Sequence, residues 1–579
     1  MKDSCAGLSL LLRYILSLSQ LRDNFKKMKI INYIKNNIWL STLIIFCLFF
    51  VTYGSIYFFI DGISFPDDHF FHIKIAKLLA NNGWRVINDF NWYPIKDGRL
   101  DLSLFQISLI PFTFFSNLLT GLRVSDVFWA ALSLAVVYFS LRKFKFKYSF
   151  LILLIIFSSS HLSNRLFLGR GFILTFGLVL LELYFAQKKK YVNFFWVSLF
   201  HILWHRSLLF FPPVIFFAVE ISRYLVVKKV KWNGLLASLG AVTCGMFFYP
   251  NFPMNMFDWM MGLFRISTDI SSGVKLEGSE LYTKNGLGFF TSFPIFSLFA
   301  IISVVLVIYF YVKSKEGPDS VSVDRDEDLL RIFSFFLMLI VFILGSMVVS
   351  GRFFDYYFIL LIILFASILE FSFRQKEVIF NEKILKYTVV ACFIFFSYLS
   401  LDNYLELRLL VAKSGYKTIK APVEWIRDNS EKGELIYLVN WSNFPEAFFY
   451  NDKNIYSWGI EPKVLNNRDP KLFWKAYNIL AYGFYCEHQV DCEDEYNEII
   501  KKIQELEKEN KKEEVLAIRK ENSRKIINSI KNDFGARFIL SSDNASTERI
   551  ELSEDLIADK FESVSEKDPN SKITAFRLK

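Results

Sequence analysis

Long stretches of the sequence contain almost no charge, although 21% of its 579 residues are Asp, Glu, Lys or Arg. These stretches are apolar runs of about 15–25 residues separated by short basic loops, the pattern of membrane-crossing helices. A soluble chain of this length would instead form several cores with charged surfaces. The pattern therefore excludes that class and predicts an α-helical polytopic membrane protein, with 53% hydrophobic residues and 65 Phe.

Metal-type spacing of Cys and His is also missing, which excludes zinc-finger-like motifs. Of the six cysteines, Cys47, Cys244 and Cys392 lie in apolar runs and are expected to pack as small core residues. Cys486 and Cys492 lie in a polar region, with EHQVD between them. In an oxidising compartment these two could form a disulfide, and free thiols are the alternative.

A basic surface for nucleic acid is missing as well. The net charge is +10, but the positive excess lies in short loops between apolar runs, and the polar C-terminal part mixes both signs. Such loops are typical of membrane topology. We therefore expect a lipid bilayer, and no nucleic acid, as a partner.

The N-terminal region lacks a small-residue cleavage site of the A-x-A type. We expect residues 1–38 to be a cytoplasmic segment, with Met28 as an alternative start, and the apolar run Trp39 to Ile60 to be a retained membrane anchor.

The basic loops decide the predicted topology. If the apolar segment 103–120 crossed the membrane, every strongly basic loop would lie outside, against the positive-inside rule. We therefore predict about eleven crossings within a transmembrane domain at 39–402, with interfacial helices at about 68–82 and 101–120. The predicted crossings are 39–60, 124–141, 148–163, 169–186, 191–204, 207–225, 234–250, 288–312, 329–350, 353–372 and 384–401. The external side then holds loops 61–122 and 251–287.

The last part of the chain, 403–579, is polar and has mixed helical and strand patterns. It predicts a small α/β domain on the external, periplasmic side of the plasma (inner) membrane. Strands are expected at 434–440, 536–542 and 573–579, a helix start at Pro422, and a charged helical stretch from Glu493 to Lys531.

Two adjacent carboxylates, Asp67 and Asp68, follow the first crossing. A carboxylate beside a bilayer is costly unless it is used or paired. One of them could act as a general base that takes a proton from an acceptor hydroxyl. The alternative is that Asp68 caps the helix that begins near His69.

The residues DHFFHIKIAK, starting at Asp68, resemble the D-x-Y-Y-H-L-R-x-A-E signature of oligosaccharyltransferase catalytic subunits and, more loosely, the F-D-E-x-H-F segment of protein O-mannosyltransferases. Residues 164–171, 350–358 and 439–465 are similar to further external segments of this GT-C superfamily. The resemblance implies a GT-C-like fold, a polyprenyl-phosphate-linked sugar donor and a catalytic acid in the first external loop.

The sequence departs from the oligosaccharyltransferase pattern at two places. No acidic residue occurs between Ser158 and Arg170, where the second acidic motif is expected, and Asn440 to Phe444 replaces W-W-D-x-G. Both departures argue against metal-dependent transfer to Asn-x-Ser/Thr sequons. A divalent metal (Mg or Mn) held by Asp68 with Glu277 or Glu280 remains a hypothesis. The loop that carries these glutamates is either a lid over the site or a plain interfacial loop.

Arginines in external turns are expected to bind the lipid phosphate, because their planar fork matches phosphate oxygens. Snorkelling to lipid headgroups is the alternative. These arginines are Arg165, Arg170, Arg206 and Arg352, the last of which is similar to a phosphate-binding arginine of the family. His205 could contact phosphate or sugar, or pack at a helix end. We expect His72 and His69 to position or pack their helix.

Together these features predict an inverting membrane glycosyltransferase that moves a sugar from a polyprenyl-phosphate or pyrophosphate donor to a glycan, lipid or protein acceptor. The alternatives are an oligosaccharyltransferase that acts on protein, a non-catalytic scaffold, and a transporter of lipid-linked glycans. A transporter is expected to show internal repeats and charges within its crossings. The sequence contains no repeat, and its crossings are almost uncharged.

Overall fold

The computed structural model describes residues 33–34, 36–58, 68–88, 102–166, 169–205, 209–249, 252–254, 294–316, 323–348, 353–374, 382–413, 419–459, 465–466, 469–488, 492–542, 556–564 and 572–579. Residues 1–32, Asp67, Arg206, Arg352 and nearly all of loop 251–287, with Glu277 and Glu280, lie outside the described residues.

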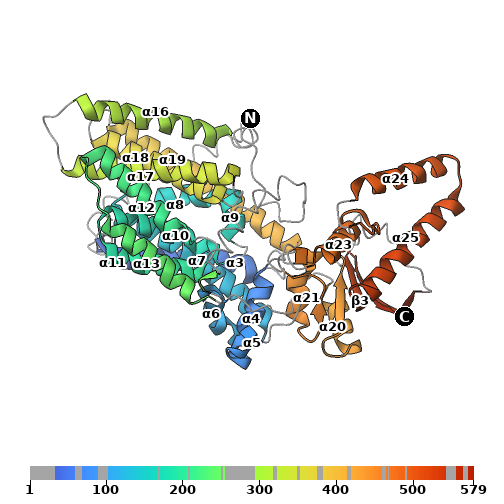
Figure 1. Cartoon of the computed structure of the whole chain (residues 1–579). Coiled ribbons are helices and arrows are strands. Elements are labelled where there is room, and N and C mark those ends of the chain that lie inside the picture. Colours follow the sequence, from blue (N-terminus) through green and yellow to red (C-terminus); the bar gives the residue numbers. More distant parts are fainter. Residues whose placement is uncertain are drawn as a thin grey trace, which may run out of the picture.

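The N-terminal two thirds of the chain form a bundle of apolar helices (Figure 1). Its main helices are α3 (Ile38–Phe58), α7 (Leu118–Lys143), α8 (Ser149–Phe157), α9 (Ser160–Leu166), α10 (Phe172–Gln187), α11 (Tyr191–Trp204), α12 (Phe211–Val227), α13 (Asn233–Phe247), α16 (Pro294–Glu316), α17 (Val323–Val348), α18 (Phe353–Arg374) and α19 (Glu382–Lys413). Helix α7 packs against α3 and α10, and α17 packs against α12 and α18.

Five of the described helices are long and apolar enough to cross a membrane. These spans are Ile38–Tyr57, Leu118–Lys143, Arg325–Ser346, Phe353–Ser372 and Tyr387–Leu409. The chain is therefore a multi-pass helical membrane protein. Most other predicted crossings correspond to shorter apolar helices such as α10, α11 and α13, so the full set of eleven stays a prediction.

The predicted crossing at 148–163 does not form one helix. Helix α8 ends at Phe157, and α9 starts only at Ser160. At this break, polar side chains donate hydrogen bonds to a backbone carbonyl at the end of α8. The Ser163 hydroxyl donates to the Phe157 carbonyl at 2.8 Å, and the Asn403 amide donates to the same oxygen at 3.0 Å. The Ser158 hydroxyl donates to the Ile155 carbonyl at 2.8 Å, and such side-chain competition for backbone hydrogen bonds favours this interruption.

The segment 101–120 is divided as well, and its interfacial position stays a prediction. It holds α6 (Leu104–Ser108) and the 3₁₀ helix η1 (Ile110–Phe114). Pro111 has no amide proton and disfavours a helical residue before it, so a single helix cannot continue through it. Lys77 donates to the Thr113 carbonyl at 3.1 Å and thereby ties η1 to the helix predicted at about 68–82.

That helix is α4 (His69–Asn82), followed by the short α5 (Arg85–Asn88), and it lies between the two halves of the molecule. Phe70, Ile73 and Ala76 pack into a cluster with Phe105 and residues of the bundle helices. The other apolar side chains of α4, namely Phe71, Ile75, Leu78 and Leu79, pack into the core of the C-terminal domain. The apolar residues of α4 thus form two faces. One packs against the helical bundle and the other against the C-terminal domain.

The C-terminal domain is built on a five-stranded sheet of order β2-β1-β3-β5-β4. The strands are β1 (Leu435–Leu438), β2 (Ile455–Tyr456), β3 (Ala536–Ser542), β4 (Ile557–Val564) and β5 (Lys572–Leu578). β1 pairs in parallel with β2 and β3, whereas β5 runs antiparallel to β3 and β4. The described helices of this domain are α20 (Lys420–Asn429), η3 (Trp441–Asn443), α21 (Phe444–Tyr450), α23 (Pro470–Tyr482), α24 (Glu493–Lys508) and α25 (Lys512–Asn532).

The predicted strands at 434–440, 536–542 and 573–579 are confirmed within two residues at their ends, and Pro422 lies in the first turn of α20. The stretch from Glu493 to Lys531 forms two helices, α24 and α25, which are joined by a turn at Asn510, where φ is +60°, and spread apart from this turn (Figure 1). Helix α19 continues to Lys413, so the boundary that we predicted after Asp402 lies inside a helix.

Candidate functional site

Asp68 lies directly before α4, at the end of the helical bundle that faces the C-terminal domain. It occupies the N-cap position, but its side chain makes no capping hydrogen bond, so the capping role that we weighed for it is not seen. Its Oδ2 lies 3.3 Å from Nε of Arg170, and the Asp68 side chain is 23% exposed. The carboxylate is therefore held by a cation and is partly exposed.

Arg170 is positioned by a Gly-Arg-Gly loop between α9 and α10. Gly169 has φ +57°, and a β-carbon at this position would collide with His69 and Asp126. A β-carbon at Gly171 would press on Phe105, and the Gly171 carbonyl accepts a hydrogen bond from the Trp204 indole. Glycine is thus required at position 169 for the loop to lie this close to α4, whereas at Gly171 a side chain would crowd Phe105 of α6.

His69 fixes the first turn of α4 against α7. Its Nδ1 is paired with the Asp126 carboxylate, and its Nε2 lies 3.2 Å from the Ser125 hydroxyl. His69 and Asp126 are buried. The geometry fits the packing role that we expected of His69, and it fixes the position of the neighbouring Asp68.

His72 lies one turn further along α4 and is held as a neutral acceptor. The Gln106 side chain accepts from the Ser103 amide at 2.9 Å, which directs its NH₂ group to His72 Nδ1 at 3.2 Å. Burial, followed by repulsion from His69, Arg170 and His205, lowers the pKa of His72 to about 3. Arg170 and His205 thus lie within electrostatic range of His72.

This pKa gives a prediction about stability. The folded pKa lies below the unfolded value of about 6.5, so on acidification the unfolded chain binds a proton that the folded chain does not. The folded state therefore loses up to about 1.4 kcal/mol per pH unit from pH 6.5 downward. His72→Gln cannot take up this proton.

The thermal midpoints of wild type and His72→Gln, measured in detergent by tryptophan fluorescence, should run in parallel above pH 7. Between pH 6 and 4 the wild-type midpoint should fall more steeply. Parallel curves over the whole range would show that His72 binds a proton equally well in the folded and unfolded chain.

A second charged cluster lies beside the first. Asp355, in the first turn of α18, is 1% exposed and pairs with His161 Nε2 at 2.7 Å and with Arg165 Nε at 3.2 Å. The Arg165 guanidinium also lies 5.7 Å from the centre of the Phe172 ring, and that ring lies 6.5 Å from the ring of His205. Phe172 thus connects the two clusters.

The structure brings together Asp68, Arg170, His72 and His205, and it places Arg165 in the neighbouring cluster. Arg165 and Arg170 were expected to bind phosphate, and both pair with carboxylates of the chain. A guanidinium has five N–H donors, so such a pair is compatible with binding of a further anion. The predictions for Asp67, Arg206, Arg352, Glu277 and Glu280 concern positions outside the described residues.

Sequence reasoning missed Asp126, Asp355, His161 and Gln106 as parts of this site. The signal for two of them was present. Asp126 is a lone acid in an apolar helix, and Asp355 begins one. A carboxylate in such a place needs a partner, and the histidines and arginines nearby were the available candidates.

The arrangement of the described residues does not suit a Mg or Mn ion at Asp68. Its carboxylate faces the positive guanidinium of Arg170, and that charge would repel a divalent cation. A contribution from Glu277 or Glu280 stays a prediction. We therefore derive the chemistry of the site from the side chains alone.

No protein-family model matches the sequence, and a search of curated proteins finds no match.

Proposed function

We propose that this chain is a membrane glycosyltransferase that moves a sugar from a polyprenyl-phosphate or pyrophosphate donor to an acceptor hydroxyl. The observation that carries the proposal is the Asp68–Arg170 pair at the head of α4. A partly exposed carboxylate that caps no helix stands beside an arginine where the apolar bundle ends. Such a pair offers both a base and a phosphate-binding cation.

In the proposed reaction the acceptor oxygen attacks the anomeric carbon of the donor sugar, and the bond from that carbon to the phosphate oxygen breaks. The acceptor proton passes to the Asp68 carboxylate. The phosphate leaves with the bonding electrons, and its negative charge is stabilised by arginine. Attack opposite to the leaving group inverts the anomeric carbon.

Within this reaction Arg170 has two roles. It holds the Asp68 carboxylate in place between turnovers through their ion pair. It also attracts the lipid phosphate by its charge. Neutral His72 adds no positive charge beside the base and presents a hydrogen-bonding edge to the sugar. Each of these side chains comes from α4 or from the loop that is packed on it.

We further propose that the site and the C-terminal domain are external. Helix α7 begins beside His69 and ends with Arg142 and Lys143, and α10 begins beside the site and ends before Lys188–Lys190. The site and the basic loops thus lie at opposite ends of these helices. Basic loops are retained in the cytoplasm, which supports an external site in the plasma (inner) membrane.

The C-terminal domain is suited to a role on the acceptor side, because it rests on the same helix as Asp68. Phe444 and Phe448 of α21 lie 5.9 and 5.7 Å from the Phe71 ring, and Lys74 pairs with Asp452 at 3.2 Å. An acceptor bound by this domain would be delivered to the head of α4. Glycan, lipid and protein acceptors all fit this part of the proposal.

Transport of a lipid-linked glycan is the second candidate function, and one observation favours it. Glu182 of α10 and His201 of α11 are fully buried and lie 3.1 Å apart between two apolar helices. Paired ionisable residues in such a place occur in proton-coupled transporters. The pair is an exception to the otherwise nearly uncharged crossings, and it lies one helical turn from the site, since the His205 amide donates to the His201 carbonyl.

A cell test separates these functions. The gene is deleted, and surface glycans and glycoproteins are compared by mass spectrometry after complementation. Under the glycosyltransferase proposal one sugar is lost from a surface product, and wild type restores it whereas Asp68→Asn does not. Under transport, Glu182→Gln abolishes the product and Asp68→Asn restores it. Unchanged glycans in the deletion strain would contradict both.

A further inference from the structure

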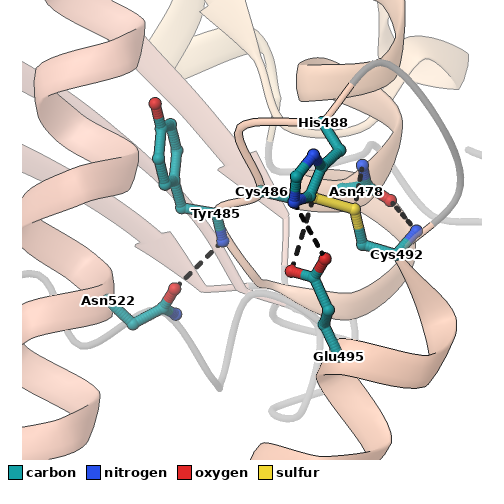
Figure 2. The surroundings of a disulfide bond; sticks show 7 residues. All are labelled: Asn478, Tyr485, Cys486, His488, Cys492, Glu495 and Asn522. Atoms are coloured by element: carbon teal, nitrogen blue, oxygen red, sulfur yellow. Dashed lines mark hydrogen bonds and ion pairs between the residues drawn. A yellow bond between two sulfur atoms is a disulfide. The ribbon is translucent and has the colours of Figure 1, made fainter.

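Among the described residues, one cluster of metal-ligating side chains has no part in the proposed transfer reaction. It surrounds the disulfide between Cys486 and Cys492 in the C-terminal domain (Figure 2). The two sulfurs and a carboxylate oxygen of Glu495 all lie within 4.8 Å of one another. The bond between the sulfurs resolves the choice between disulfide and thiols that the sequence left open.

A fourth possible donor, His488, lies beside Glu495. His488 Nε2 is 3.3 Å from Glu495 Oε1, and Cys486 Sγ is 3.8 Å from Glu495 Oε2. Figure 2 shows the imidazole and the carboxylate beside the Cys486 end of the disulfide. Two sulfurs, one imidazole nitrogen and one carboxylate oxygen form a set that suits Zn²⁺ in a tetrahedral site.

The surrounding protein holds these groups by contacts that do not depend on the S–S bond. Asn478 is fully buried in α23, accepts from the Cys492 amide at 3.2 Å and points its NH₂ group at Cys492 Sγ at 3.6 Å. Asn522 of α25 accepts from the Tyr485 amide at 3.0 Å. Glu495 lies in the first turn of α24, a helix that begins directly after Cys492.

The four groups differ in their exposure to solvent. Cys486 and Cys492 are buried, whereas His488 and Glu495 are exposed at the surface. A metal ion could therefore be captured by the two outer groups and passed to the sulfurs. With Zn–S bonds of about 2.3 Å, two thiolates in a tetrahedral site lie roughly 3.8 Å apart, so the S–S bond must first be cleaved.

We propose that the reduced form of this cluster is a Zn²⁺ site made by Cys486, His488, Cys492 and Glu495. The disulfide and the metal are then alternative ways of closing the same turn. A dithiol reductant supplies two electrons and two protons to the disulfide and becomes a disulfide itself. Zn²⁺ next displaces the two thiol protons. The spacing Cys-x-His-x₃-Cys-x₂-Glu is not that of a zinc finger, which is why sequence reasoning passed over it.

The test uses the full-length protein in detergent. It is purified in the disulfide form, reduced with a phosphine, incubated with Zn²⁺ and desalted, and its metal content is measured by elemental mass spectrometry. Cys486→Ser/Cys492→Ser gives the background from the other cysteines. Reduced wild type should hold one additional zinc per chain over this background, and oxidised wild type should hold none.

Two variants separate a four-ligand site from chelation by the thiols alone. His488→Ala and Glu495→Gln keep the disulfide for purification, and each should weaken Zn²⁺ binding by about tenfold or more, since even outer partners of a metal site contribute that much. Glu498→Gln, an exposed carboxylate one turn further along α24, is the matched control and should bind as wild type. The proposal is overturned if reduced wild type binds no more zinc than the double serine variant, or if His488→Ala and Glu495→Gln both bind like wild type.

Discussion

Replacing Asp68 by Asn is expected to lower the rate of sugar transfer by about 10²–10⁴-fold, the range that general bases contribute. An amide has nearly the same size as the carboxylate and still accepts a hydrogen bond from Arg170, so α4 keeps its place. The amide cannot take the acceptor proton. The rate is measured with saturating donor and acceptor, so that the loss appears in kcat rather than in binding.

Asp452→Asn is the matched control for this variant. Asp452 also pairs with a cation of the same region, Lys74 on α4, but it belongs to the C-terminal domain and is 38% exposed. Ion pairs at the surface contribute about 0–1 kcal/mol, so transfer should stay within about twofold of wild type. An equal loss in both variants would assign the effect to docking of α4 and would contradict the role of Asp68 as a base.

The largest effect on stability is expected for Asp355→Asn. This carboxylate is buried and pairs with His161 and Arg165. Removing one partner of a buried pair leaves the other charge without compensation and typically costs about 3–5 kcal/mol. The thermal midpoint in detergent should therefore fall by several degrees, and the fraction that elutes as a monodisperse peak should shrink.

The control is Asp559→Asn on β4. Asp559 lies 3.7 Å from Arg577 and is 49% exposed, so its pair is screened by water. Its loss should change stability by less than about 0.5 kcal/mol. If the thermal midpoints of the two variants fall by the same amount, the pairing of Asp355 is not what holds α9 and α18 at the site.

Periodicity predicted the elements of this fold better than their ends. Helix α11 begins and ends at the residues where its apolar run does, and β3 matches its predicted range. Strand β2, with two residues, is too short for any alternation to show, and β4 carries charged and apolar residues without a clear face. Helix α19 runs past the predicted boundary because its polar end at 402–413 keeps helical spacing.

The candidate site was only partly predictable, for a physical reason. Asp68 and Arg170 were found because each stands next to an apolar run, where a charge is costly. Their pairing could not be found, since it depends on the loop at Gly169 lying against His69 of α4. Likewise, no acid occurs between Ser158 and Arg170, and the partner of His161 and Arg165 is Asp355, from a helix far along the chain. The sequence thus shows which charged residues need a partner, but the identity of that partner depends on the tertiary fold.

The most direct test of the glycosyltransferase proposal follows the donor itself. Purified protein is reconstituted in liposomes with lipid-linked sugars extracted from the cells that express it, and lipids and products are followed by mass spectrometry. We predict that wild type consumes a polyprenyl-phosphate-linked or pyrophosphate-linked sugar and releases the unglycosylated lipid phosphate in equal amount, with Asp68→Asn slower by at least about 100-fold. The account is contradicted if wild type consumes no lipid-linked sugar when acceptor extract is present, or if Asp68→Asn consumes it as fast as wild type.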